Sequence, residues 1–140
     1  MRVGALSDGF VLDASIALGW AFTDEQSEAG DAAEQLLLLG YARVPSFWTA
    51  EVANALVSGL RRGRIDAAEI DEFIADLASL DIRAEPNQQL LGTLVEFAAT
   101  SGLTGYDSAY VQLALDHGLP LATADKRMRE VAQSFGVALI

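Results

Sequence analysis

Short apolar runs alternate with longer helical segments along this chain of 140 residues. The runs at residues 10–12 and 119–122 predict strands, and a weaker run at 41–44 predicts a second strand. An edge strand is predicted at 82–84 and a last strand at 137–140. Strands that alternate with helices are typical of a parallel sheet with helices on both faces. The alternation therefore predicts an α/β fold, a three-layer sandwich around a central, mostly parallel sheet.

Helices are predicted between these runs, at residues 14–22, 24–39, 47–60, 66–80, 87–100, 104–117 and 125–135. The sequence shows no internal repeat, low-complexity stretch or linker. Its length suits one compact domain and leaves little room for a second. We therefore expect a single domain that spans residues 1–140.

The residue types that are missing narrow the possible chemistry. The chain has no cysteine, which excludes disulfides, thiolate metal sites and cysteine nucleophiles. It has one histidine, His117, so a metal site must consist mainly of oxygen ligands, which favours Mg²⁺ or Mn²⁺. The lack of cysteine fits a reducing cytoplasm, and no apolar stretch reaches the roughly 18 residues of a membrane span. We expect a cytoplasmic protein without membrane contact.

The chain is strongly acidic, with 20 Asp and Glu residues against 9 Lys and Arg residues and a net charge of −11. A chain with this net charge is not expected to bind nucleic acid through overall electrostatic attraction to the phosphates. Binding would need a local basic patch or a metal ion. The charge balance also suggests a basic protein partner.

Acidic residues stand where strands end. Asp13 directly follows the first predicted strand, and Asp125 follows the strand at 119–122. Ligands of parallel sheets bind beyond the carboxyl ends of the strands. Glu51 and Asp107 lie near the starts of two helices, and spacing alone does not establish that Asp107 reaches the same edge.

Each acid also fits a purely structural role. Asp13 and Asp125 fit helix N-caps, Asp107 fits a variant capping box with Thr104, and Glu51 fits a helix face turned to water. If all four converge, however, their repulsion is costly unless a cation neutralises it. One or two divalent ions would do so and would activate water for attack on a phosphodiester.

Four sequence blocks match one protein family in order and spacing. They are Val11–Ser15 with the following Trp20, Pro45–Leu56, Leu103–Tyr110 and Leu121–Asp125. Over essentially the whole chain the sequence resembles PIN domains, and most closely the VapC-type toxins of bacterial toxin–antitoxin pairs. One block alone means little, whereas four in order are a specific signal.

The resemblance implies a PIN-like α/β sandwich whose acidic pocket binds Mg²⁺ or Mn²⁺ and cleaves single-stranded RNA. It implies that Asp13, Glu51, Asp107 and Asp125 are the catalytic and metal-binding acids. Asp13 and Asp107 would be the central metal ligands. Glu51 and Asp125 would hold a second ion, or water on the first.

The same resemblance implies supporting residues and partners. The hydroxyls of Ser15 and Thr123 would orient a carboxylate or the bound phosphate, and Asn54 would line the pocket. A cognate antitoxin would bind and block the enzyme, and two copies of the chain would form a homodimer.

Six of the nine basic residues fall in two short clusters. Lys126 and Arg127 directly follow Asp125, so we predict that they contact RNA phosphates beside the cleaved bond. Alternatively, arginines of this cluster pair with acids such as Glu130 on a solvated helix. The cluster at residues 61–64 is better explained by the preference of cations for helix C-termini.

We therefore predict a metal-dependent endoribonuclease, a VapC-like toxin whose RNA substrate is single-stranded or looped. The alternative from another class is a non-catalytic α/β binding module whose acids are helix caps. A receiver-like phosphoacceptor domain is disfavoured, because the only lysine, Lys126, stands past the strand end.

Overall fold

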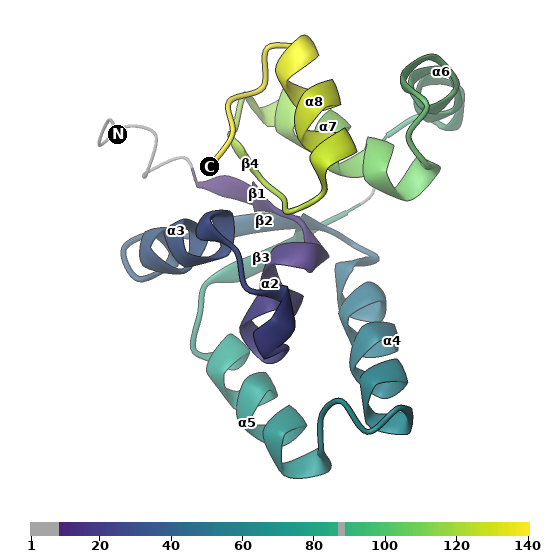
Figure 1. Cartoon of the computed structure of the whole chain (residues 1–140). Helices are drawn as coiled ribbons and strands as arrows, with labels where there is room; N and C mark the ends of the chain where they lie inside the picture. Colours follow the sequence, from purple (N-terminus) through teal and green to yellow (C-terminus); the bar gives the residue numbers. More distant parts are fainter. Residues whose placement is uncertain (1–8, 87–88) are drawn as a thin grey trace.

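The computed structural model of the chain describes residues 9–86 and 89–140. Its centre is a sheet of four strands in the order β3-β2-β1-β4, and every pairing is parallel (Figure 1). The strands are β1 (Phe10–Leu12), β2 (Ala42–Pro45), β3 (Ile82–Glu85) and β4 (Leu121–Ala122). The predicted central parallel sheet is confirmed, and so is the edge position of the strand that begins at Ile82.

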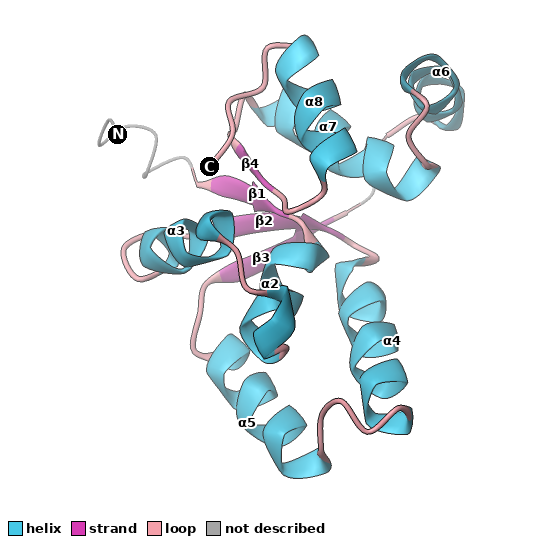
Figure 2. Ribbon diagram, in the orientation of Figure 1, coloured by secondary structure: helices cyan, strands magenta, loops and turns pink. Residues whose placement is uncertain are grey.

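Helices cover both faces of this sheet (Figure 2). Helices α7 and α8 lie on one side, where α7 packs against three strands, and α2, α3 and α5 lie on the other. The helices are α2 (Ala14–Ala21), η1 (Thr23–Glu25, a 3-10 helix), α3 (Glu28–Leu37), α4 (Trp48–Arg61), α5 (Ala67–Ala78), α6 (Leu91–Ser101), α7 (Gly105–His117) and α8 (Lys126–Ser134). The predicted three-layer sandwich is confirmed. Within the described ranges, none of these helices is both long and apolar enough to cross a membrane.

The sheet is buried because its central strands are apolar on both faces. Val11, Leu12 and Leu121 have no exposed surface, and neither does Ile16 in the helix that follows β1. Strands covered by helices on both sides read as continuous apolar runs, which is the pattern of these segments. The apolar runs thus fix the carboxyl ends of β1 and β4 at one edge of a rigid core.

The single helix predicted at 24–39 is wrong. The structure has the short η1 and then α3, which starts at Glu28. Ser27 separates them, because its extended backbone lets its hydroxyl accept a hydrogen bond from the Gly30 N–H at 3.0 Å. An N-cap of this kind starts a new helix rather than continuing an old one.

The last predicted strand, at 137–140, is also wrong. Leu139 forms one isolated bridge with Leu121, supported by hydrogen bonds of Leu121 to Ala138 and Ile140. β4 has only two residues, so it offers little backbone for a further strand to pair with. The helix predicted at 87–100 begins at Leu91 in the structure, and residues 87–88 lie outside the described residues.

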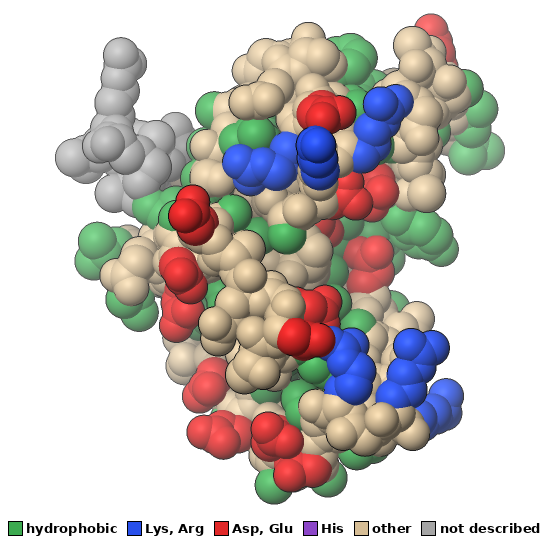
Figure 3. Space-filling model, in the orientation of Figure 1, with side chains coloured by type: hydrophobic (Ala, Val, Ile, Leu, Met, Phe, Trp, Pro, Cys, Tyr) green, Lys and Arg blue, Asp and Glu red, His purple; other side chains and the backbone are tan. Residues whose placement is uncertain are grey.

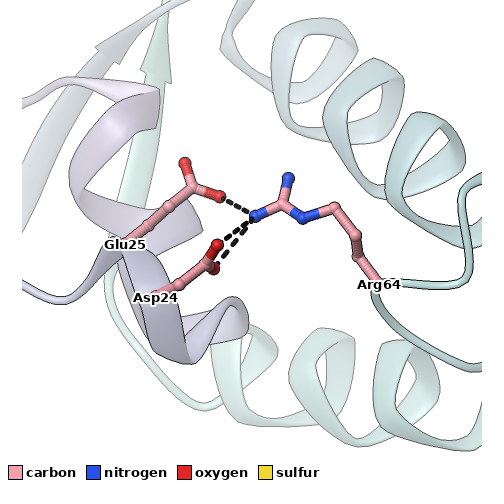
Figure 4. A network of polar contacts seen from close by, with 3 residues as sticks. All are labelled: Asp24, Glu25 and Arg64. Carbon is pink, nitrogen blue, oxygen red and sulfur yellow. Dashed lines mark hydrogen bonds and ion pairs between the residues drawn. The ribbon is translucent and has the colours of Figure 1, made fainter.

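Arg64 ties the loop after α4 to the segment after α2 (Figure 4). Its Nη2 atom donates hydrogen bonds to Asp24 at 3.0 Å and to Glu25 at 2.8 Å. Its guanidinium also lies 4.4 Å from the centre of the Phe22 ring, which is within reach of a cation–π interaction. One member of the first basic cluster therefore has a structural partner on the protein itself.

Candidate active site

Asp13 lies directly after β1 and is almost fully buried, with 6% of its surface exposed. It occupies the N-cap position of α2, but its side chain makes no capping hydrogen bond. Instead, the hydroxyls of Ser15 and Thr123 donate hydrogen bonds to its Oδ2 atom at 2.6 and 2.7 Å. Burial raises the pKa of Asp13, and these hydroxyls oppose part of the rise. The carboxylate is held firmly in surroundings that disfavour its negative charge.

The turn after β4 is joined to the turn after β1 by hydrogen bonds. Thr123 is fully buried, and its Oγ1 atom also accepts a hydrogen bond from the Asp125 N–H at 3.1 Å. The Ala124 N–H donates to the Ser15 hydroxyl at 3.2 Å. Residues 110 positions apart in the sequence thereby form one wall around Asp13.

Asp125 caps α8, as the structural alternative proposes. Its Oδ1 atom accepts a hydrogen bond from the Met128 N–H at 2.8 Å, and the residue is exposed. Its negative charge nevertheless contributes to the raised pKa of both Asp13 and Asp107. Capping and membership of the acidic cluster are therefore compatible for this residue.

Asp107 lies in the first turn of α7 and is half-buried. The cap of this helix is Thr104, whose hydroxyl accepts a hydrogen bond from the Asp107 N–H at 3.1 Å. Burial raises the pKa of the Asp107 carboxyl most, followed by the charges of Asp13 and Asp125. The start of α7 thus reaches the edge at which β1 and β4 end, which the sequence left open.

Glu51 is half-buried in the first turn of α4, so it does not simply face water. Its Oε1 atom accepts a hydrogen bond from the hydroxyl of Tyr110, with 2.5 Å between the oxygens. Burial is the main cause of its raised pKa, and the charges of Asp13 and Asp107 add to it, while the bond from Tyr110 opposes it. Glu51 therefore belongs to the same electrostatic group as Asp13 and Asp107.

The structure brings the four predicted acids into mutual electrostatic influence at one edge of the sheet. Asp13, Glu51 and Asp107 each have a raised pKa to which other members of the group contribute. The edge lies where β1 has β2 on one side and β4 on the other, which is the switch point at which such sheets bind ligands. Four acids from four separate parts of the chain meet there.

Of the other predicted residues, Asn54 shares α4 with Glu51, and Lys126 and Arg127 directly follow Asp125. Asn54 is exposed on α4 in a surface hollow of about 500 Å³ that Arg61 and Arg62 also line, and no hydrogen bond within the described residues links Asn54 to the acids. Lys126 and Arg127 are exposed at the start of α8, and the Arg127 Nη2 atom donates to the Ser101 carbonyl at 2.8 Å. Figure 3 shows Lys and Arg side chains in a row beside Asp and Glu side chains on this part of the surface.

The donor set fits a hydrated divalent cation. Within residues 9–86 and 89–140, no three His, Asp or Glu side chains stand close enough to form a metal site directly. Mg²⁺ does not need three, because it usually keeps several waters and binds through one or two carboxylates. Burial and, after it, the charges of neighbouring acids raise the pKa of Asp13 and of Asp107, and a cation at this edge would offset both effects.

Sequence reasoning assigned no role to Tyr110, and it placed Arg129 only in the second basic cluster, with RNA phosphates or acids such as Glu130 as its partners. Tyr110 is fully buried, and its hydroxyl joins α7 to Glu51. It stands three residues after Asp107 on the same helix, and this spacing could have indicated that it lies near the acids. Arg129 donates through Nη1 to the carbonyl of Thr123 at 3.1 Å. Its spacing of four from Asp125 placed it beside the same edge.

Comparison with known proteins agrees with this geometry. The family model described as PIN domain matches residues 10–134. A solved structure, PAE2754 from Pyrobaculum aerophilum, is similar with a TM-score of 0.65 and 24% sequence identity, over 94% of this chain and 90% of that one. No curated protein matches the chain. PIN domains are generally nucleases that use divalent metals, and a match over most of the sequence shows that this chain belongs to the PIN domain family.

Proposed function

We propose that this protein is a metal-dependent endoribonuclease of the VapC type, which cleaves single-stranded RNA or RNA loops. The observation that carries the proposal is the acidic cluster formed by Asp13, Glu51, Asp107 and Asp125. A buried aspartate whose pKa is raised by burial and by the charge of Asp125, and which two hydroxyls hold in place, costs stability unless a cation compensates it. Carboxylates with perturbed pKa values tend to cluster at functional sites.

Each residue of the cluster has a part in the proposed reaction. Asp13 and Asp107 would hold Mg²⁺ or Mn²⁺, and Glu51 and Asp125 would hold a second ion or orient water. Ser15 and Thr123 keep the Asp13 carboxylate in one orientation. A bound divalent ion would supply Lewis-acid activation of water and neutralise the charge that builds on the phosphate. The protein contributes by fixing these carboxylates on a rigid sheet edge.

The alternative function is a non-catalytic binding module in which the acids only cap helices. Of the four acids, Asp125 alone accepts a capping hydrogen bond from its helix. Asp13 sits at an N-cap position without capping, and Thr104 caps the helix of Asp107. Three of the four acids therefore do not cap a helix, as this alternative would require.

The test is RNA cleavage by the purified protein, free of antitoxin, with Mg²⁺ and Mn²⁺ titrated separately. We expect metal-dependent cleavage that Asp13→Asn and Asp107→Asn abolish while the fold remains intact. Asp116→Asn is the matched control, because Asp116 is exposed near the other end of α7, where it accepts a hydrogen bond from Gln112. Cleavage of the same strength in a mock purification without the protein would reveal a contaminating nuclease. An unimpaired Asp13→Asn enzyme would remove the hypothesis.

The proposal includes a cognate antitoxin and a cytoplasmic location, the latter expected from a chain without cysteine. An apolar groove of about 330 Å³ supports the first of these. It lies between α4, α5 and the strands β2 and β3, and Trp48, Ile74, Leu77 and Ile82 line it. Ile74 is 52% exposed, so the groove has room for an apolar segment of a partner. The net charge of −11 favours a basic partner.

The proposal also includes a homodimer, and α6 supports it. Leu91 and Val95 lie one turn apart on this helix and are 79% and 58% exposed. Exposed apolar helix faces of this kind mark interaction surfaces. The double variant Leu91→Glu/Val95→Glu should be a monomer by light scattering at concentrations where the wild type is a dimer. A monomeric wild type would refute this part of the proposal.

A further inference from the structure

A second hollow lies beside the acidic cluster, between the start of α3 and the turn that joins β4 to α8. Its volume is about 530 Å³. Glu28, Ala29 and Ala32 line it from α3, and Thr123, Ala124 and Arg129 line it from the other side. We call this hollow the α3–α8 pocket. None of the functions discussed above uses it.

The α3–α8 pocket shares a wall with the candidate active site. Thr123 lines the pocket, and its hydroxyl donates to Asp13. Ala124 also lines the pocket, and its N–H donates to Ser15 beside Asp13. A strand of RNA with one phosphate at the acids would therefore place a neighbouring nucleotide near this pocket.

Arg129 gives the pocket a fixed cation. Its Nη1 atom donates to the carbonyls of Thr123 and Ile140, at 3.1 and 3.4 Å. Within residues 9–86 and 89–140, no acid forms an ion pair with Arg129, and its Nε and Nη2 atoms make no hydrogen bond. Because only Nη1 is bonded to the protein, the Nε and Nη2 donors of this guanidinium are available to a ligand.

The walls favour a nucleobase over a phosphate. Glu28 is an acid and would repel a phosphate, but it can accept a hydrogen bond from the N–H groups of a base. The alanine side chains offer apolar surface. The flat face of a base can pack against such a surface, whereas a phosphate gains nothing from it. Unpaired bases of single-stranded RNA are recognised through such combinations of apolar walls and polar edges.

We propose that the α3–α8 pocket binds one unpaired nucleobase of the RNA, next to the cleaved phosphodiester. Arg129 donates to acceptor atoms of the base and Glu28 accepts from its donor atoms. The pocket is then a specificity-determining site of the nuclease. This inference rests on the proposed function, because the base belongs to the RNA that the acids cleave.

Steady-state cleavage of RNA tests the role of the pocket. Arg129→Gln removes the cation, and Ala32→Leu fills the exposed mouth of the pocket without touching a polar contact. Each variant should raise KM by about tenfold or more, with a smaller change in kcat. Arg129→Gln loses a charge-assisted hydrogen bond to the base, and Ala32→Leu prevents the base from entering the pocket. Arg62→Gln and Ala75→Leu are exposed matched controls and should leave KM unchanged.

A binding experiment without metal separates the pocket from catalysis. Free nucleosides at millimolar concentration should shift the NMR methyl signals of Ala29 and Ala32 in the wild type, and not in Arg129→Gln. No shift, or a shift with inorganic phosphate and none with nucleosides, would overturn the inference even if the protein cleaves RNA. Nucleoside shifts in a protein that cleaves no RNA would support base binding and defeat the proposed function instead.

Discussion

The hydroxyl of Tyr110 donates a hydrogen bond to the Glu51 carboxylate at 2.5 Å and accepts one from the Ala14 N–H at 3.4 Å. One buried side chain on α7 thereby links α4 to the residue that follows Asp13. Burial is the main cause of the raised pKa of Tyr110, and the bond to Glu51 adds to it, so the hydroxyl stays protonated as a donor. The phenol thus sets the position of Glu51 relative to the other acids.

The variant Tyr110→Phe should destabilise the protein and reduce cleavage. It leaves the half-buried Glu51 carboxylate without its donor, which typically costs about 1–3 kcal/mol of unfolding free energy. Urea denaturation measures that loss. Tyr106→Phe is the matched control, because Tyr106 is 62% exposed and makes a ring contact with Phe47. Equal stability of Tyr110→Phe and wild type would contradict the prediction.

In the metal-free protein, the contribution of Asp13 to stability should be lost as the pH rises above about 4, the ordinary pKa of aspartate. Folding raises the pKa of Asp13, mainly through burial, so the folded state holds that proton more tightly than the unfolded chain. This contribution to the free energy of unfolding is therefore fully present below the unfolded pKa and is lost as the pH rises to the raised pKa of folded Asp13. Urea midpoints at a series of pH values in EDTA measure this slope. Asp13→Asn should flatten it, and an unchanged slope would show that Asp13 is not the cause.

Mg²⁺ or Mn²⁺ should raise the melting temperature at neutral pH. An ion at about 100 times its dissociation constant stabilises the folded state by about 2.7 kcal/mol, or roughly 5–10 °C for a domain of this size. Asp107→Asn should lose most of this shift, whereas Asp116→Asn should keep it. An equal shift in both variants would place the ion elsewhere.

The double variant Lys126→Ala/Arg127→Ala should bind single-stranded RNA more weakly and with less dependence on salt. Removing two phosphate contacts lowers the slope of log K against log salt by about 1.4. Fluorescence anisotropy at several salt concentrations measures this slope. Arg127 also bonds to the Ser101 carbonyl, so equal melting temperatures must accompany the comparison. A double variant that binds as tightly as wild type at every salt concentration would exclude these phosphate contacts.

The sheet and most helices could be predicted because their signals are local. The apolar run at Phe10–Leu12 and the capping box of Asp66 and Glu69 are readable within a few residues. The break between η1 and α3 was missed because acidic residues before Ser27 continue a helix-like pattern. A serine that caps and a serine on a helix surface look alike in a sequence.

The polar contacts around the site could not be predicted, because they depend on packing between distant elements. The bond from Tyr110 to Glu51 joins residues 59 positions apart, and its formation depends on how α4 and α7 meet. The sequence also presented capping and clustering as alternatives for Asp125, whereas the structure shows a cap whose charge acts on Asp13. Local patterns identified the acids, and tertiary structure decided their contacts.

The wall that Thr123 and Ala124 build beside Asp13 has a consequence for protein synthesis. Asp13 and Ser15 are synthesised well before Thr123, whose hydroxyl is the second of the two that hold the Asp13 carboxylate. A nascent chain on the ribosome therefore carries an incomplete site until β4 joins the sheet. In the ribonuclease that we propose, the messenger from which the chain is being translated would in this way be spared.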